Sequence, residues 1–163
     1  MSYVKWRMHT RMGVAQFGGS QQMNEKIALR GNWTQMPSMR TGRSYDPYEH
    51  AANLGLNVVY RKLRAGNGLW IPEIRTIFLQ RRLRAIHERS VLAHELGHVL
   101  LGHRESTPKN EIQADRWAAR RLVDPHELRA AAATTHDIGQ WCHELNVSAD
   151  ILERYLRDNR KIA

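Results

Sequence analysis

The feature that most constrains this chain is the pentapeptide H-E-L-G-H at residues 94–98, which lies within an apolar stretch at residues 91–101. In a helix, positions four apart share one face, so His94 and His98 can direct two imidazole nitrogens to the same metal ion. Glu95 lies between them and can reach a water molecule on that metal. The motif therefore predicts a metal centre built on a helix.

The predicted motif helix has two recognisable ends. Ser90 is the expected N-cap, because a serine hydroxyl can accept a hydrogen bond from a backbone N–H of the first turn. Gly102 is expected to end the helix, since glycine readily adopts the conformation that follows a last turn. The alternative interpretation is a core helix that carries two half-buried histidines and no metal.

The position of a third ligand separates the subclasses of such enzymes. In metzincins another His follows the second His by six positions, but here that position holds Arg104 and His103 is one residue short. Downstream, Glu111 and Asp115 are spaced four apart, so both carboxylates project from one helical face. One can bind the metal, and the other can accept a hydrogen bond from the far ring nitrogen of a ligating His.

Ala114 lies between these carboxylates and is small enough to let the second helix approach the motif helix closely. The alternative for this segment is a solvated helix face, because Arg116, Arg120 and Arg121 follow it. The preceding H-E-x-x-H motif favours the metal site.

Together these segments resemble the ImmA/IrrE family of metallopeptidases. The resemblance rests on residues 94–98, on Glu111-x-x-Ala-Asp115, on a helix end from Ala118 to Pro125, and on a downstream segment at 147–156 that begins Val-Ser. It spans roughly residues 46–159. The first forty or so residues match no pattern of that family.

The resemblance implies a zinc-dependent endopeptidase of the thermolysin type. His94, His98 and Glu111 would be the ligands of one Zn²⁺ per chain, Glu95 the general base, and Asp115 the residue that orients His94. Better-known members are cytoplasmic proteins of bacteria, phages or mobile elements that cleave a helix-turn-helix repressor. Longer members carry a sensory domain, for which this chain is too short.

Length and composition indicate the number of domains and the cellular compartment expected for such an enzyme. A length of 163 residues predicts one domain with a sizeable core. The lone Cys142 excludes an internal disulfide and a cysteine-rich zinc site, and it indicates a reducing compartment. No apolar stretch approaches the ~18 residues that a membrane span needs, and the N-terminus has no continuous apolar region typical of a signal peptide. We therefore expect a cytoplasmic protein, in a bacterial host cell, without a membrane partner.

The net charge of +9 raises the question of an anionic partner. Basic residues cluster at 61–64 and between Arg75 and Arg89. Such a surface is compatible with proximity to DNA, with an acidic protein partner, or with simple solvation.

The pattern along the chain predicts an α+β fold with three parts. Residues 1–44 form an irregular or mobile lead-in. Residues 45–123 form the catalytic core, with a helix at 47–54 and a small three-stranded sheet from strands at 57–61, 69–71 and 75–79, packed on the active-site helix pair. Residues 124–163 form an all-helical segment packed on the core, with a helix-turn-helix-like hydrophobic pattern.

Two finer expectations concern substrate and DNA. The strand at 75–79, or the strand around Trp70, is expected to hold a substrate backbone by β-augmentation. The last helix offers a mixed set of side chains that includes Arg154, so we favour a structural role for the helix pair over DNA reading. Candidates for the oxyanion-stabilising residue are His103, His126, His136 and Tyr155.

The leading hypothesis is thus a regulatory zinc endopeptidase that cleaves a helix-turn-helix repressor or antitoxin-like protein. The alternative is a DNA- or protein-binding regulator with a structural or degenerate metal site.

Overall fold

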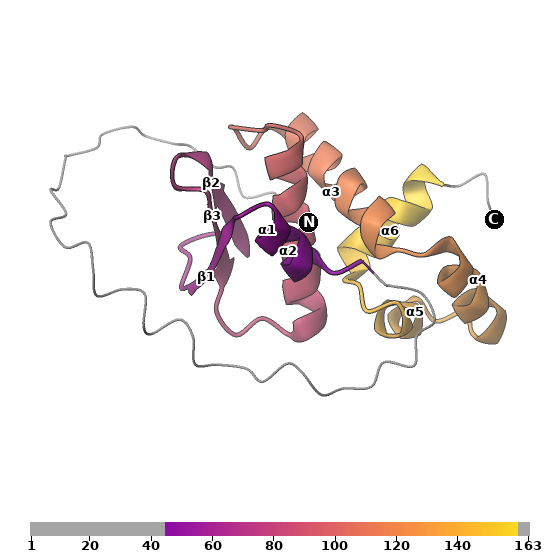
Figure 1. Ribbon diagram of the computed structural model, residues 1–163. Coiled ribbons are helices and arrows are strands. Elements are labelled where there is room, and N and C mark those ends of the chain that lie inside the picture. Colours follow the sequence, from indigo (N-terminus) through magenta and orange to yellow (C-terminus); the bar gives the residue numbers. More distant parts are fainter. Residues whose placement is uncertain (1–44, 160–163) are drawn as a thin grey trace, which may run out of the picture. The chain divides into compact units, whose positions relative to one another are not determined.

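The computed structural model describes residues 45–159, and the predicted lead-in at 1–44 lies outside the described residues. In the described part, one short helix precedes three strands, and five helices follow (Figure 1). The elements in chain order are α1 (Pro47–Asn53), β1 (Asn57–Arg61), β2 (Gly68–Ile71), the 3₁₀ turn η1 (Pro72–Ile74), β3 (Thr76–Gln80), α2 (Ala85–Leu100), α3 (Pro108–Leu122), α4 (Pro125–Thr134), α5 (Ile138–Glu144) and α6 (Ala149–Asp158). The predicted α+β class is confirmed, and the three-part division of the chain stays a prediction.

The sheet has the order β1-β3-β2, with β1 parallel and β2 antiparallel to β3. The central strand β3 buries Ile77 and Leu79 completely. The prediction that the strand at 75–79 offers a free edge to a substrate is wrong, because β3 is hydrogen-bonded on both sides. The strand around Trp70 is β2, which does lie at an edge of the sheet.

Helix α2 begins earlier than the sequence suggests. Its N-cap is Arg84, so the prediction that Ser90 caps the helix is wrong. Ser90 is instead buried inside α2, where its hydroxyl accepts a hydrogen bond from the backbone N–H of Ser148 at 2.9 Å. The hydroxyl thus satisfies a backbone group at the start of α6 rather than one of its own helix. Gly102 follows the end of α2 with φ of +67°, as predicted.

Helix α2 is shared by two hydrophobic clusters. Leu92 and Leu96 pack with the sheet and α1, in a cluster completed by Ala51, Leu56, Ile77 and Leu79. Ala93 belongs to the other cluster, which joins α3 to the C-terminal helices through Ala118, Ala119, Leu122, Val123, Leu145, Val147, Ile151 and Leu152. The motif helix is therefore held on two sides. No helix within residues 45–159 combines the length and apolar character needed to cross a membrane.

Helices α2 and α3 touch at Gly97 and Ala114. A Cβ atom built on Gly97 would lie 3.0 Å from both the Cα and the carbonyl oxygen of Ala114. These are backbone atoms of a packed helix, so they cannot move aside as a flexible side chain would. The sequence predicted a close approach at Ala114, and the structure shows that Gly97 is the other half of the contact.

We predict that Gly97→Ala destabilises the protein. Helix propensity alone would favour alanine by about 1 kcal/mol, whereas overpacking of a tight contact typically costs about 1–3 kcal/mol. Urea unfolding of the metal-free protein measures the balance. Ala133→Gly, at an exposed position of α4, is the control and should lose about 1 kcal/mol from propensity alone. A Gly97→Ala variant more stable than the wild type would show that the contact between Gly97 and Ala114 leaves room for a methyl group.

Candidate metal centre

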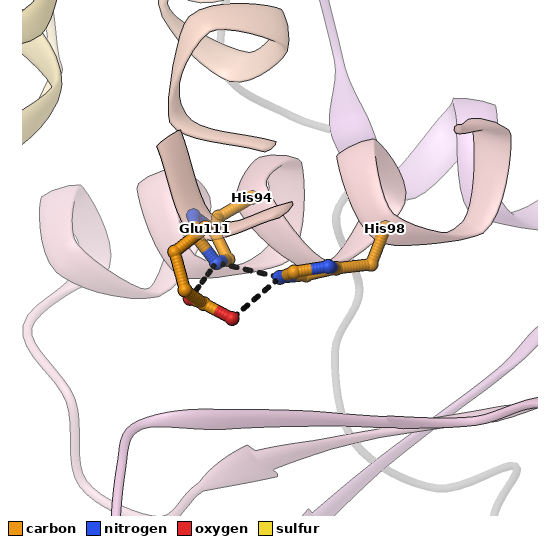
Figure 2. A group of neighbouring side chains, drawn as sticks. All are labelled: His94, His98 and Glu111. Atoms are coloured by element: carbon orange, nitrogen blue, oxygen red, sulfur yellow. Dashed lines mark hydrogen bonds and ion pairs between the residues drawn. The ribbon is translucent and has the colours of Figure 1, made fainter. Parts of the chain in front are cut away.

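Three partly buried side chains from helices α2 and α3 converge on one small volume. His94 and His98 come from consecutive turns of α2, and Glu111 comes from the first turn of α3 (Figure 2). The Nε2 atoms of the two histidines are 3.0 Å apart. Glu111 places Oε2 at 3.2 Å from Nε2 of His94 and Oε1 at 3.5 Å from Nε2 of His98. Each residue thus aims one ligand atom at the same small volume.

This spacing fits a zinc-sized ion. Zinc bonds to His nitrogen and carboxylate oxygen are about 2.0–2.2 Å long, so two ligands of a tetrahedral ion lie about 3.3–3.5 Å apart. The three contacts of 3.0–3.5 Å bracket that separation without any rearrangement of the helices. All three ligand atoms lie within 4.8 Å of one another. The residues are therefore able to hold a divalent cation.

The far ring nitrogen of His94 is held by Asp115, whose Oδ1 lies 2.8 Å from Nδ1. A carboxylate only accepts, so Nδ1 carries a hydrogen, and Nε2 is the ring nitrogen that faces the other two candidate ligands. Burial lowers the pKa of His94, but hydrogen bonds to Asp115 and Glu111 outweigh burial and raise that pKa to about 10. Without a metal, a proton on Nε2 therefore takes the position between His94 and Glu111 that a bound cation would occupy.

Helix α6 contributes Arg154 to the same cluster. Its Nε lies 4.0 Å from Oδ2 of Asp115, and the Arg154 side chain is only 11% exposed. The guanidinium thus places a positive charge near the carboxylate that binds His94, but its buried Nε has no hydrogen-bond partner among the described residues. A side chain in this position is not presented to solvent, so Arg154 is not available to read DNA.

Glu111 is held ready as an anion. The hydroxyl of Ser106, just before the N-cap Thr107, donates a hydrogen bond of 2.7 Å to Oε1 of Glu111. Burial raises the pKa of Glu111, but hydrogen bonds from His94, His98 and Ser106 outweigh that effect and hold the pKa well below its ordinary value. The carboxylate is ionised at neutral pH, as a metal ligand must be.

Glu95 lies on the sheet side of the motif helix and is only 7% exposed. Its carboxylate accepts a hydrogen bond from the backbone N–H of Trp70 in β2. Burial raises the pKa of Glu95 above its ordinary value, and the nearby His94 and His98 partly oppose that rise. A buried carboxylate of raised pKa beside a cation site is suited to accept and return a proton.

Strand β2 passes directly over this carboxylate at Gly68. A Cβ atom built on Gly68 would overlap Oε1 of Glu95 and lie 2.7 Å from its Cγ. Only glycine leaves room for the carboxylate where it stands. Sequence reasoning missed Gly68 and the Trp70 N–H, and it had only the turn-like run Gly66-Asn67-Gly68 as a signal.

The structure brings together all five residues that the sequence nominated for this site: His94, Glu95, His98, Glu111 and Asp115. The oxyanion candidates are distributed differently. His103 packs behind His98, with the two Nδ1 atoms 3.1 Å apart. His126 contacts Arg129 within α4, and Tyr155 packs against the C-terminal cluster. His136 is an exposed residue just before α5.

We predict that Asp115→Asn weakens zinc binding by about 10–100-fold, the usual effect of losing a partner that orients a ligand. His98→Ala should abolish binding at this site, because a ligand is lost. Competition of the metal-free protein with a chromophoric chelator measures both. The control is Asp158→Asn, which removes a carboxylate that pairs with Arg116 instead of with a ligand. Equal zinc affinity of Asp115→Asn and wild type would contradict the orienting role.

Comparison with known proteins adds a family to this geometry. A search of curated proteins returns no match. The model of the peptidase family M78, described as an IrrE N-terminal-like domain, matches residues 51–157. The matched range contains both helices of the centre and the strand that covers Glu95. The match covers well over half of the chain, and it agrees with the resemblance seen in the motifs. The chain therefore belongs to the IrrE N-terminal-like family of peptidases.

Proposed function

We propose that this protein is a zinc-dependent endopeptidase that cleaves a regulatory protein. The observation that carries the proposal is the convergence of His94, His98 and Glu111 at zinc-like spacing, with a buried carboxylate, Glu95, beside them. Membership in a metallopeptidase family supports the same reaction class. When bound, zinc would supply a water molecule of lowered pKa and a Lewis acid for the scissile carbonyl.

The chain's own residues divide the remaining work. Glu95 would take the proton of the attacking water at a carboxylate oxygen and return it to the leaving amine as the C–N bond breaks. The backbone N–H of Trp70 would donate to that carboxylate, and Gly68 leaves space for it. Asp115 would keep the ring of His94 in the orientation and tautomer that a ligand needs.

The substrate would lie along β2. This strand pairs with β3 on one side and has no described strand on the other, so an extended peptide can add to it by β-augmentation. Because β2 also covers Glu95, a peptide backbone paired there would run alongside the proposed general base. That arrangement suits cleavage within a chain, rather than only at its end.

We further propose that the substrate is a helix-turn-helix repressor or antitoxin-like protein in the cytoplasm of a bacterial host. The resemblance to the ImmA/IrrE family supports this choice. Exposed basic residues at the carboxyl ends of β1 and β3 would suit a substrate bound to DNA. Arg61, Lys62, Arg81 and Arg82 belong to this group, and the Arg81 N–H donates to the Arg61 carbonyl at 3.2 Å.

We predict that Glu95→Gln binds zinc within about threefold of the wild type but loses cleavage, since a general base typically contributes about 100–10,000-fold to the rate. The measurement is mass spectrometry of a helix-turn-helix repressor encoded beside this gene, co-expressed with each variant. His98→Ala is the companion variant and should lose both metal and cleavage. Normal cleavage by Glu95→Gln would remove Glu95 as the base. DNA binding that survives chelation, without cleavage, would favour a regulator with a structural or degenerate metal site.

We predict that Gly68→Ala lowers kcat by about 100-fold, because a displacement of about 1 Å at a catalytic group has that effect. The new methyl group meets the flexible side chain of Glu95, so the carboxylate should shift while the fold and the zinc affinity persist. The control is Asn67→Ala, one residue earlier, where the side chain is exposed. A Gly68→Ala enzyme with wild-type kcat would show that the position of Glu95 is not set by β2.

A further inference from the structure

The second histidine of the motif has a partner that the sequence does not assign. Nδ1 of His98 lies 3.1 Å from Nδ1 of His103, and Nε2 of His103 lies 3.1 Å from Oε1 of Gln113. His103 reaches this place because the chain turns back after α2. Gly102 adopts φ of +67°, and the backbone N–H of His103 donates to the carbonyl of His98 at 2.9 Å.

The hydrogens of this chain of contacts can be assigned from chemistry. An amide oxygen only accepts, so Nε2 of His103 carries the hydrogen that binds Gln113. A neutral imidazole has one N–H, so Nδ1 of His103 is an acceptor and receives the N–H of Nδ1 of His98. His98 is then left with a lone pair on Nε2, the atom that faces His94 and Glu111.

The opposite direction of hydrogen bonding conflicts with the site. If the amide of Gln113 donated to His103, then His103 would donate to His98, and the hydrogen of His98 would be on Nε2. That nitrogen is 3.0 Å from Nε2 of His94 and would have no lone pair for a metal. The geometry of the ligands therefore selects one direction, from His98 through His103 to Gln113.

We propose that His103 and Gln113 form a positioning pair that fixes the ring and tautomer of His98 for metal binding. The proposal rests on the metal centre of the proposed function and deepens it. His94 has a charged partner, Asp115, whereas His98 has a neutral one. A carboxylate partner makes a ligating histidine more basic, so one neutral partner leaves the bound cation a stronger Lewis acid than two carboxylates would.

The test compares three variants of the full chain for zinc affinity and for the visible spectrum of the Co²⁺-loaded protein. His103→Phe keeps a ring but removes the acceptor, and we expect about tenfold weaker zinc binding with an altered Co²⁺ spectrum. His103→Asn places Oδ1 where Nδ1 was, so it should recover most of the affinity and the wild-type spectrum. Gln113→Met removes the distal acceptor from α3 at similar size, and it should weaken binding less than His103→Phe does.

The outcomes separate positioning from packing. Thermal unfolding of the metal-free variants shows whether the fold itself has changed. If His103→Phe matches the wild type in zinc affinity and Co²⁺ spectrum, the proposal that His103 and Gln113 position His98 is wrong. If His103→Asn binds as weakly as His103→Phe, the ring acts by shape alone and the proposal is also wrong. Zinc binding that depends on His103 in a protein that cleaves nothing would support the pair and contradict the endopeptidase. A wild-type chain that binds no zinc would overturn both.

Discussion

The close contact of Gly97 with Ala114 is the constraint on which the metal centre depends. Two helices normally pack at 8–10 Å, with larger side chains between them, and a glycine facing an alanine removes that layer. On α2, His94 lies three positions before Gly97 and His98 lies one position after it. On α3, Glu111 and Asp115 have the same spacing around Ala114. The crossing point therefore fixes which side chains face each other across the interface: His94 and His98 on α2, and Glu111 and Asp115 on α3.

The crossing is supported by layers that have no part in metal binding themselves. Leu92 and Leu96 hold α2 against the sheet, and Ala93 holds it against the C-terminal helices. Polar atoms buried beside these layers need partners, because an unpaired one is costly. The structure supplies several of them from distant segments, such as the Trp70 N–H for Glu95 and the Ser90 hydroxyl for the Ser148 N–H. The sheet and the C-terminal helices thus stabilise the centre from opposite sides.

The parts of the site that the sequence could predict are those governed by local periodicity. Spacing of four residues put His94 and His98 on one face, and it did the same for Glu111 and Asp115, without knowledge of the tertiary fold. Ser90 shows where this reasoning ends. Serine is a preferred N-cap residue, but the hydroxyl of Ser90 accepts a hydrogen bond from the N–H of Ser148, 58 residues away. A local rule cannot reveal which long-range partner a polar group will meet.

The strand order and the role of Gly68 could not be predicted, for the same reason. Both affect how the sheet positions Glu95, the proposed general base. The sequence alone does not show whether a glycine after a turn is required by the turn itself or by a tertiary contact. Here the tertiary contact requires it, because β2 covers the carboxylate of Glu95. The strand that would bind a peptide backbone also donates to the proposed base through Trp70. A peptide that shifts β2 on binding would move the N–H that holds Glu95. If the proposed function holds, substrate binding and the position of the base would thereby be coupled through one edge strand.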